Sequence, residues 1–249
     1  MPEEGGYESL AQVYDLLMDD FDYDAWARHY LTLLGPARDA CELACGTGSL
    51  TVRFARSGLR MTGIDRSRAM LRQAGEKCRQ WGVSVPLICQ DMRGFALTRR
   101  TGAVLCTCDG VNYLLEEEDL SSFLRSCRRA LRENGTLLFD VSTPYKLETV
   151  TGERFFGEER DGIATLWQNR LDRARSRITM DLTVFVREQD GRYRRFRETH
   201  RQRWWQREEL EAALRAAGFT QIGFFGDYTL EAPKEESLRW HVRARAGEE

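Results

Sequence analysis

Short apolar runs alternate with helix-like segments along the middle of the chain. In order, the apolar runs cover 40–45, 59–64, 85–89, 103–108 and 136–141, and the helical stretches cover about 48–57, 67–81 and 119–132. Apolar runs that are bounded by turns and alternate with helices are typical of parallel βαβ units. Such strands are buried on both faces, which explains why the runs lack polar alternation. The pattern predicts an α/β fold with a mostly parallel sheet and helices on both faces.

The segment before this pattern reads as two helices within residues 7–34. Leu10, Val13, Tyr14 and Leu17 recur at helical spacing in the first, and the second covers about 24–34 before Gly35-Pro36. Aromatic side chains of these helices could form a lid over a ligand, although most aromatic stripes are simply core. The candidates are Tyr7, Tyr14, Tyr23 and Trp26.

After residue 141 the pattern changes to extended stretches in which apolar and polar residues alternate. One covers 178–184 and a second covers 193–205, with Asp190-Gly191 between them. An Asp-Gly pair between alternating segments is a strong hairpin signal. The α/β pattern then returns as a helix over 207–217 and strands over 219–225 and 237–245. We therefore expect one domain over 1–249, divided into a helical lid (1–38), a ligand-binding core (39–145), an antiparallel β insertion (150–205) and a return to the core sheet (206–249).

Composition narrows the classes of function. A net charge of −2 argues against bulk attraction to nucleic acid or anionic membrane, and no run approaches the ~20 apolar residues of a membrane span. Most of the seven cysteines lie inside apolar runs, and the three histidines are far apart in sequence, so no metal site is expected. We expect a cytoplasmic protein whose oligomeric state the sequence does not indicate.

The segment CELACGTGSL, residues 41–50, joins an apolar run to the start of a helix. Its glycines, Gly46 and Gly48, allow the backbone to turn sharply and to approach a ligand without an intervening Cβ. Free N–H groups at a helix start favour a carboxylate or phosphate. A GxG turn also occurs in α/β domains purely for packing, so it indicates little alone.

Polar residues follow the next three runs where each ends. Asp65 closes the run MTGID and lies 19 residues after Gly46. This is close to the ~20 expected between a glycine turn and an acidic residue that accepts hydrogen bonds from ribose hydroxyls. Asp91-Met92 and Cys108-Asp109 end the two runs that follow. One such residue could merely cap a helix, but together they favour a ligand-binding edge of the sheet.

The set ELACGTG, GIDRS, QDM and CDGVNYL resembles the motifs of class I methyltransferases that depend on S-adenosyl-L-methionine (SAM). It is most similar to the stand-alone bacterial type that acts on small molecules. YESLAQVYDLLMDDFDYDAW and LRENGTLLFDV are similar to that type too, so the resemblance covers nearly the whole chain and is loose in the insertion. It implies a Rossmann-like, mostly parallel seven-stranded sheet whose last strand is antiparallel. It also implies SAM as methyl donor, with S-adenosyl-L-homocysteine as product.

The resemblance implies a role for each residue along the glycine loop and the strand ends. Residues near the methionine part of SAM would be Glu42, Ala44, Cys45, Gly46, Thr47, Gly48, Cys108 and Asp109. Residues near the ribose and adenine would be Asp65, Asp91 and Met92, with Arg66 and Met70 flanking the adenosine and Tyr14 over the cofactor. The first glycine usual in this loop is Ala44 here, which leaves less space for the cofactor.

The strand expected over 193–205 groups an acid, an imidazole and an amide beside two aromatic rings on one face, as side chains alternate. These residues are Phe196, Glu198, His200, Gln202 and Trp204. His200 is the candidate general base for a protonated acceptor, although it could instead be a structural residue, since alignment alone can carry methyl transfer. If Asp190-Gly191 forms a two-residue turn, Asp181 pairs opposite His200, and a bulge would reverse that register. Asn112 and Tyr113 could also reach the donor or the acceptor.

The most probable function is methyl transfer from SAM to a nitrogen or oxygen of a small molecule. Methylation of RNA or protein is an alternative, because the other face of the same strand carries Arg195, Arg197, Arg201 and Arg203. A solvated strand face, balanced by Glu188, Asp190 and Glu198, explains these arginines better. A SAM- or nucleotide-binding module without catalysis is another alternative. An NAD-linked oxidoreductase is disfavoured because Thr51 stands where the dinucleotide motif has its third glycine.

Overall fold

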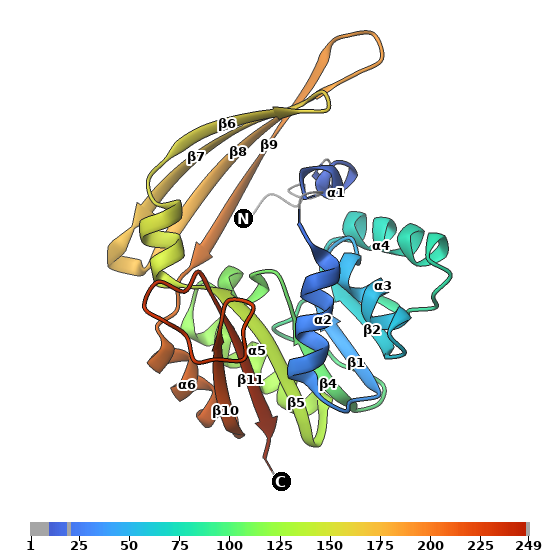
Figure 1. Cartoon of the computed structure of the whole chain (residues 1–249), viewed down its shortest axis with the longest axis vertical. Helices are drawn as coiled ribbons and strands as arrows, with labels where there is room; N and C mark the ends of the chain where they lie inside the picture. The colour runs from blue at the N-terminus through green and yellow to red at the C-terminus, as the bar shows by residue number, and fades with distance from the viewer. Residues whose placement is uncertain (1–9, 19–20, 248–249) are drawn as a thin grey trace.

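A seven-stranded sheet forms the centre of the molecule, and the computed structural model describes residues 10–18 and 21–247 (Figure 1). The strand order is β10-β11-β5-β4-β1-β2-β3. The bounds are Asp39–Leu43 (β1), Arg60–Asp65 (β2), Leu87–Cys89 (β3), Thr101–Cys106 (β4), Leu131–Ser142 (β5), Phe219–Gly226 (β10) and Arg239–Ala246 (β11). Strands β1 to β5 pair in parallel, and β11 runs antiparallel to both of its neighbours. The predicted sheet, including its antiparallel last strand, is confirmed.

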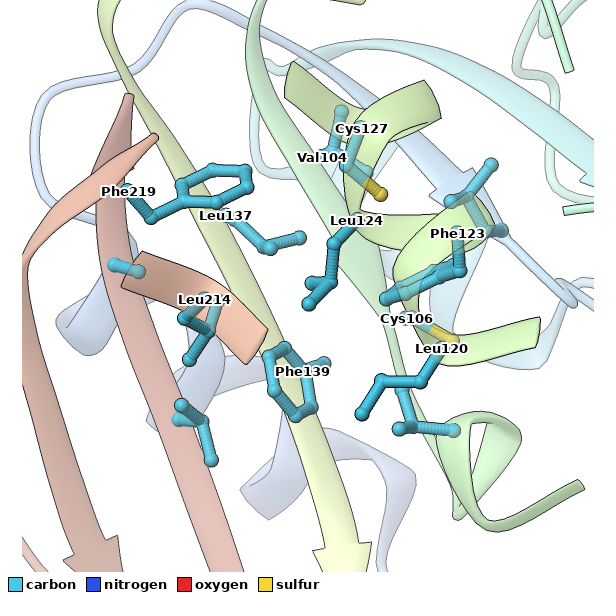
Figure 2. Close-up of a cluster of buried hydrophobic side chains, with 14 of the residues drawn as sticks. Val104, Cys106, Leu120, Phe123, Leu124, Cys127, Leu137, Phe139, Leu214 and Phe219 are labelled. Atoms are coloured by element: carbon cyan, nitrogen blue, oxygen red, sulfur yellow. The ribbon is translucent and has the colours of Figure 1, made fainter. Parts of the chain in front are cut away.

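Helices cover both faces of this sheet. They are α2 (Tyr23–Leu34), α3 (Ser49–Arg56), α4 (Arg68–Gln80), α5 (Glu117–Ala130) and α6 (Arg207–Ala216), with a short 3-10 segment η2 (Gly110–Tyr113) after β4. Side chains of β4 alternate between two cores: Val104 and Cys106 lie in the cluster with α5 and α6, whereas Ala103 and Leu105 lie in the cluster with α2 and α3. Figure 2 shows the first cluster, in which Phe123 of α5 lies beside Phe139 of β5. Burial on both faces is the reason that the apolar runs show no polar alternation.

A second sheet stands over the carboxyl edge of the first (Figure 1). It has four antiparallel strands in sequence order, β6 (Phe155–Arg160), β7 (Ile163–Asp172), β8 (Arg177–Arg187) and β9 (Tyr193–Arg203). A π-helical segment, η3 (Tyr145–Thr151), connects it to β5, and a short 3-10 segment, η4 (Arg173–Arg175), joins β7 to β8. The insertion that the sequence predicted is therefore a complete sheet.

The turn between β8 and β9 is longer than two residues. Arg187 pairs with Tyr193, so residues 188–192 form the turn. As a result Met180, and not Asp181, lies opposite His200. The predicted Asp181–His200 pairing is wrong, because the longer turn shifts the register by one residue and moves Asp181 to the other face of the sheet.

The chain before α2 forms two short pieces, η1 (Leu10–Gln12) and α1 (Tyr14–Leu17), where one helix was expected. Leu10 and Val13 pack against Leu182 and Val184 of the second sheet. Since Ala11 and Tyr14 pack with Ala69 and Met70 of α4, this N-terminal segment lies between the second sheet and α4 (Figure 1). Tyr7 falls outside the described residues. No helix within residues 10–18 and 21–247 has both the length and the apolar character that crossing a membrane requires.

Candidate functional site

The glycine loop after β1 places its backbone against Asp65 at the end of β2. Gly46 N–H donates to Asp65 Oδ2 at 2.9 Å, and Ser67 N–H donates to Asp65 Oδ1 at 2.8 Å. Ala44, Gly46 and Gly48 all have left-handed φ angles of 50°, 55° and 76°. A Cβ added at Gly46 would meet no heavy atom within 4 Å, so the loop borders open space beside the Asp65 carboxylate.

Gly48 has the opposite environment. A Cβ there would lie 3.0 Å from the Cβ of Ala74 in α4. The loop and α4 therefore pack closely, which only a residue without a side chain allows at this φ. The two glycines therefore differ: Gly46 borders open space, whereas Gly48 allows the loop to pack against α4.

Glu42 of β1 is fully buried behind the loop, and both of its oxygens accept hydrogen bonds from threonines. Thr51 Oγ1 donates to Oε2, and Thr107 Oγ1 donates to Oε1 at 2.8 Å. Burial raises the pKa of Glu42 to about 7, although both threonine bonds oppose that rise. Thr51 occupies the position of the absent third glycine, so its hydroxyl gives that departure a structural reason that the sequence did not indicate.

The N-terminal segment closes over the same loop. Asp15 of α1 accepts a hydrogen bond from Thr47 Oγ1 at 2.7 Å and forms an ion pair of 2.7 Å with Lys77 Nζ of α4. Tyr14, beside it, packs with Met70 at the start of α4. Burial raises the pKa of the Tyr14 hydroxyl, and the nearby Cys108 raises it further. Tyr14 therefore lies between the predicted adenosine and methionine sides of the site.

The turn after β4 rests on a buried group of charges. Cys108 and Asp109 both have left-handed φ angles, 56° and 63°, and Asp109 N–H donates to Asp140 Oδ2 at 3.1 Å. Arg239 of β11 forms ion pairs with both Asp109 and Asp140, and Tyr30 donates its hydroxyl hydrogen to Asp140. These bonds fix the turn in a conformation that is otherwise costly for residues with a side chain.

The charges in this group also set the state of Asp109. Burial alone would raise its pKa, but Arg239 and Lys146 outweigh burial and hold the pKa at about 2. Asp140 is fully enclosed, and burial raises its pKa. Asp109 is therefore a carboxylate at neutral pH. Asp109 was predicted from the sequence as a site residue, whereas Asp140 and Arg239 were not.

Asp91, Met92 and Arg66, the residues expected near the adenosine, lie respectively in an ion pair, against the core and in solvent. The Asp91 carboxylate pairs with Arg93 at 2.6 Å, and Arg93 also pairs with Asp119 of α5. Asp91 caps no helix: its oxygens accept hydrogen bonds from the backbone N–H and the guanidinium of Arg93 within one turn. Met92 packs against the main core, and Arg66 is exposed to solvent.

The face of β9 that was predicted to carry the acceptor residues is the buried face of the strand. Glu198, His200 and Gln202 are each less than a tenth exposed, whereas Arg195, Arg197 and Arg201 are exposed on the opposite face, and Arg203 is partly buried. Tyr113 of η2 lies with its hydroxyl 3.3 Å from His200 Nδ1. His200 therefore faces the carboxyl edge of the main sheet, near the Cys108–Asp109 turn.

Burial controls the protonation of both titratable residues on this face. It lowers the pKa of His200, which favours the neutral imidazole, and it raises the pKa of Glu198 to about 7. Both groups can therefore accept a proton near neutral pH.

Asn112, also predicted near the acceptor, is hydrogen-bonded to the backbone of two strands. Its Nδ2 donates to the carbonyls of Ser142 and Arg203, and its Oδ1 accepts from Ser142 N–H. Both amide hydrogens are thus used in tying β5 to β9. Asn112 therefore links these two strands in the structure, and its contact with donor or acceptor stays a prediction.

The comparisons with known proteins agree with this arrangement. A family model described as a methyltransferase domain matches residues 40–135. Over 238 residues the chain is 34% identical to a protein of Geobacillus sp. (strain WCH70) that is named as a methyltransferase, with 94% of this chain and 96% of the relative covered. It is also 26% identical over 217 residues to the dTDP-3-amino-3,4,6-trideoxy-alpha-D-glucopyranose N,N-dimethyltransferase of Streptomyces venezuelae, covering 84% of this chain and 89% of that one.

Among solved structures, an S-adenosylmethionine-dependent methyltransferase from Clostridium acetobutylicum ATCC 824 superposes with a TM-score of 0.87. It is 27% identical in sequence, and the match covers 97% of this chain and 99% of that one. The second sheet is therefore shared along with the core. The chain belongs to the class I, Rossmann-like methyltransferases that depend on S-adenosylmethionine.

Proposed function

We propose that the protein transfers a methyl group from SAM to a nitrogen or oxygen of a small-molecule acceptor, with S-adenosyl-L-homocysteine as product. The observation that carries this proposal is the meeting of two sets of residues at one edge of the sheet. Asp65, Gly46 and the Cys108–Asp109 turn form one set, and Tyr113 with His200 forms the other. The first has the chemistry to hold a nucleoside bearing an amino acid, and the second has the chemistry to deprotonate an acceptor.

Asp65 would accept hydrogen bonds from the ribose hydroxyls, since Gly46 and Ser67 already fix the orientation of its carboxylate. The Asp109 carboxylate, which remains ionised, would attract the ammonium group of the methionine part. Tyr14 would cover the cofactor from above. SAM supplies an electrophilic methyl group on a sulfonium centre, so the protein's main tasks are alignment and exclusion of water.

A nitrogen acceptor is compatible with the two buried bases, and the name of one relative favours it over oxygen. Glu198 and His200 lie on one buried face and can take up the proton that an amine carries at neutral pH. The relative from Streptomyces venezuelae is named for dimethylation at the nitrogen of an amino sugar. The amine would lose its proton to His200 or Glu198. Its lone pair would then attack the methyl carbon as the carbon–sulfur bond breaks and the sulfur keeps the electron pair.

RNA remains the weaker candidate for the acceptor. The exposed arginines, Arg195, Arg197 and Arg201, alternate with His200 along β9 and so lie on the other face of the sheet. An RNA bound to them would therefore not present its base to His200.

The proposal is tested with His200→Ala and with Thr199→Ala as a matched control on the exposed face of the same strand. Purified protein is incubated with SAM and a set of primary amines and phenols, and S-adenosyl-L-homocysteine is quantified. We expect His200→Ala to lower kcat by roughly 100-fold or more, with little change in SAM affinity. Thr199→Ala should match the wild type. Equal turnover of His200→Ala and the wild type would exclude His200 as the base.

A further inference from the structure

The inner face of the second sheet consists of two apolar clusters with a polar band between them. Toward the tip, Leu182 and Val184 pack with the N-terminal segment. Toward η3, Ile178 packs with Leu147 and Trp204. Glu198 and His200 of β9 belong to the polar band. A third polar residue lies on the same face but two strands away.

That residue is Asn169 of β7. It pairs across the sheet with Met180, and Met180 in turn pairs with His200. The three side chains therefore point to the same face in one row. Because neighbouring strands lie about 4.8 Å apart, the backbones at Asn169 and His200 are separated by roughly 10 Å.

The surroundings of Asn169 do not satisfy its carboxamide. The residue is 5% exposed, and neither Nδ2 nor Oδ1 has a hydrogen-bond partner among the described residues. Its neighbours on the same face of β7 are Trp167 and Leu171, which belong to the two apolar clusters. Buried polar groups are nearly always hydrogen-bonded, and an unpaired buried amide destabilises the folded state. A leucine would fit this environment better unless a ligand supplies the missing partners.

The contrast with Asn112 supports this reading. Asn112 is also buried, at 0% exposed, yet both of its amide hydrogens reach backbone carbonyls. The fold therefore uses one buried asparagine to join strands and leaves the other unpaired on the face that carries His200.

We propose that Asn169 is a specificity-determining residue of the acceptor site, where its carboxamide binds a hydroxyl group on the part of the acceptor remote from the methylated atom. A hydroxyl can both donate to Oδ1 and accept from Nδ2, which matches the two unpaired atoms. An anionic group would fit poorly, because Glu198 occupies the same face. This inference rests on the proposed function and extends it: the acceptor is an amine that also bears a hydroxyl group, with the two groups up to about 10 Å apart.

The N-terminal segment covers part of the face on which Asn169 lies. Both amide atoms are enclosed in this arrangement, and Leu10 and Val13 cover part of the same face. Withdrawal of this segment would open the face, and its return, through the Asp15–Lys77 ion pair, would close the cofactor loop at the same time.

The test compares the wild type, Asn169→Leu and the matched control Gln168→Leu, which removes a carboxamide from the exposed face of the same strand. The acceptors are glucosamine and aminohexanol, each beside an analogue without hydroxyl groups, cyclohexylamine and hexylamine. We expect the wild type to prefer the hydroxylated member of at least one pair. Asn169→Leu should raise KM for that member and lower its kcat/KM by roughly tenfold or more, leaving KM for SAM and turnover of the analogue unchanged. Gln168→Leu should behave as the wild type.

The melting temperature provides a readout that needs no acceptor. If the Asn169 carboxamide is unpaired until the acceptor binds, Asn169→Leu should melt at the same temperature as the wild type or at a higher one. A lower melting temperature together with an unchanged acceptor preference would make Asn169 a structural residue and overturn the proposal. Binding of SAM without methylation of any hydroxylated amine would also overturn it while leaving the cofactor assignment intact. Failure to bind SAM at all would instead contradict the proposed function.

Discussion

Replacing Arg239 with methionine tests whether the buried charges hold the site together. Arg239 is 9% exposed and pairs with Asp109 and Asp140, and its guanidinium carbon lies 4.7 Å from the centroid of the Trp26 ring. Removing one partner from a buried ion pair typically costs about 3–5 kcal/mol, because the other charges stay buried without compensation. For a protein of this size, that loss corresponds to a fall in melting temperature of roughly 10 °C or more.

The same change has an expected pH dependence. Without Arg239, the pKa of Asp140 rises further, because burial is no longer opposed by the guanidinium. Protonation then relieves the unpaired charge, so the difference in unfolding free energy between Arg239→Met and the wild type should shrink as the pH falls and grow as it rises.

The assay is urea denaturation followed by tryptophan fluorescence, at several pH values. The control is Arg132→Met, which removes a two-bond pair with Asp39 whose arginine side chain is half exposed. Exposed pairs contribute about 1 kcal/mol at most, so the control should lose little. If Arg239→Met costs no more than Arg132→Met, the cluster is not the support of the Asp109 turn that the structure indicates.

Three further changes test separate parts of the site. Gly48→Ala should lower the free energy of unfolding by about 1–2 kcal/mol and weaken SAM binding, because the left-handed φ and the 3.0 Å approach to Ala74 exclude a methyl group. Thermal melting measures the first effect, and calorimetric titration of SAM measures the second. In Glu42 the folded pKa of about 7 exceeds the ordinary 4.5, so stability should fall as pH rises from about 4.5 through 7, and Glu42→Gln should flatten that part of the denaturation profile. Lys77→Met removes the ion pair with Asp15 and should loosen the N-terminal segment. The expected results are faster proteolysis near the N-terminus and a higher KM for SAM. Unchanged cleavage would show that this ion pair does not hold the segment in place.

Local patterns in the sequence were sufficient to predict the main sheet. β1, β4 and most of β5 are buried on both faces, and their apolar runs mark them directly. β2 and β3 are less buried but also coincide with apolar runs. The run expected over 40–45 ends earlier, at Leu43, because Ala44 adopts a left-handed conformation that begins the loop. β6 gave no such signal: its residues, Phe155 to Arg160, are mostly exposed and follow neither strand nor helix periodicity.

The buried contacts of the site join residues far apart in sequence, so local patterns could not predict them. Arg239 meets Asp109 across 130 positions of sequence, so nothing near either residue indicated the pair. The register of β9 relied on turn length, and two residues were assumed where five occur. By contrast, the buried face of β9 followed from simple alternation, which is why Glu198 and His200 were found.

The most direct test of the account is calorimetric titration of SAM, S-adenosyl-L-homocysteine and NAD into the wild type and Asp65→Ala. The account predicts that SAM and its product bind the wild type with affinity on the order of micromolar and that NAD does not bind. Asp65→Ala, with its melting temperature checked, should bind SAM roughly 100-fold more weakly, since two charge-assisted hydrogen bonds are lost. Binding of NAD alone, or equal SAM affinity in the variant and the wild type, would contradict it.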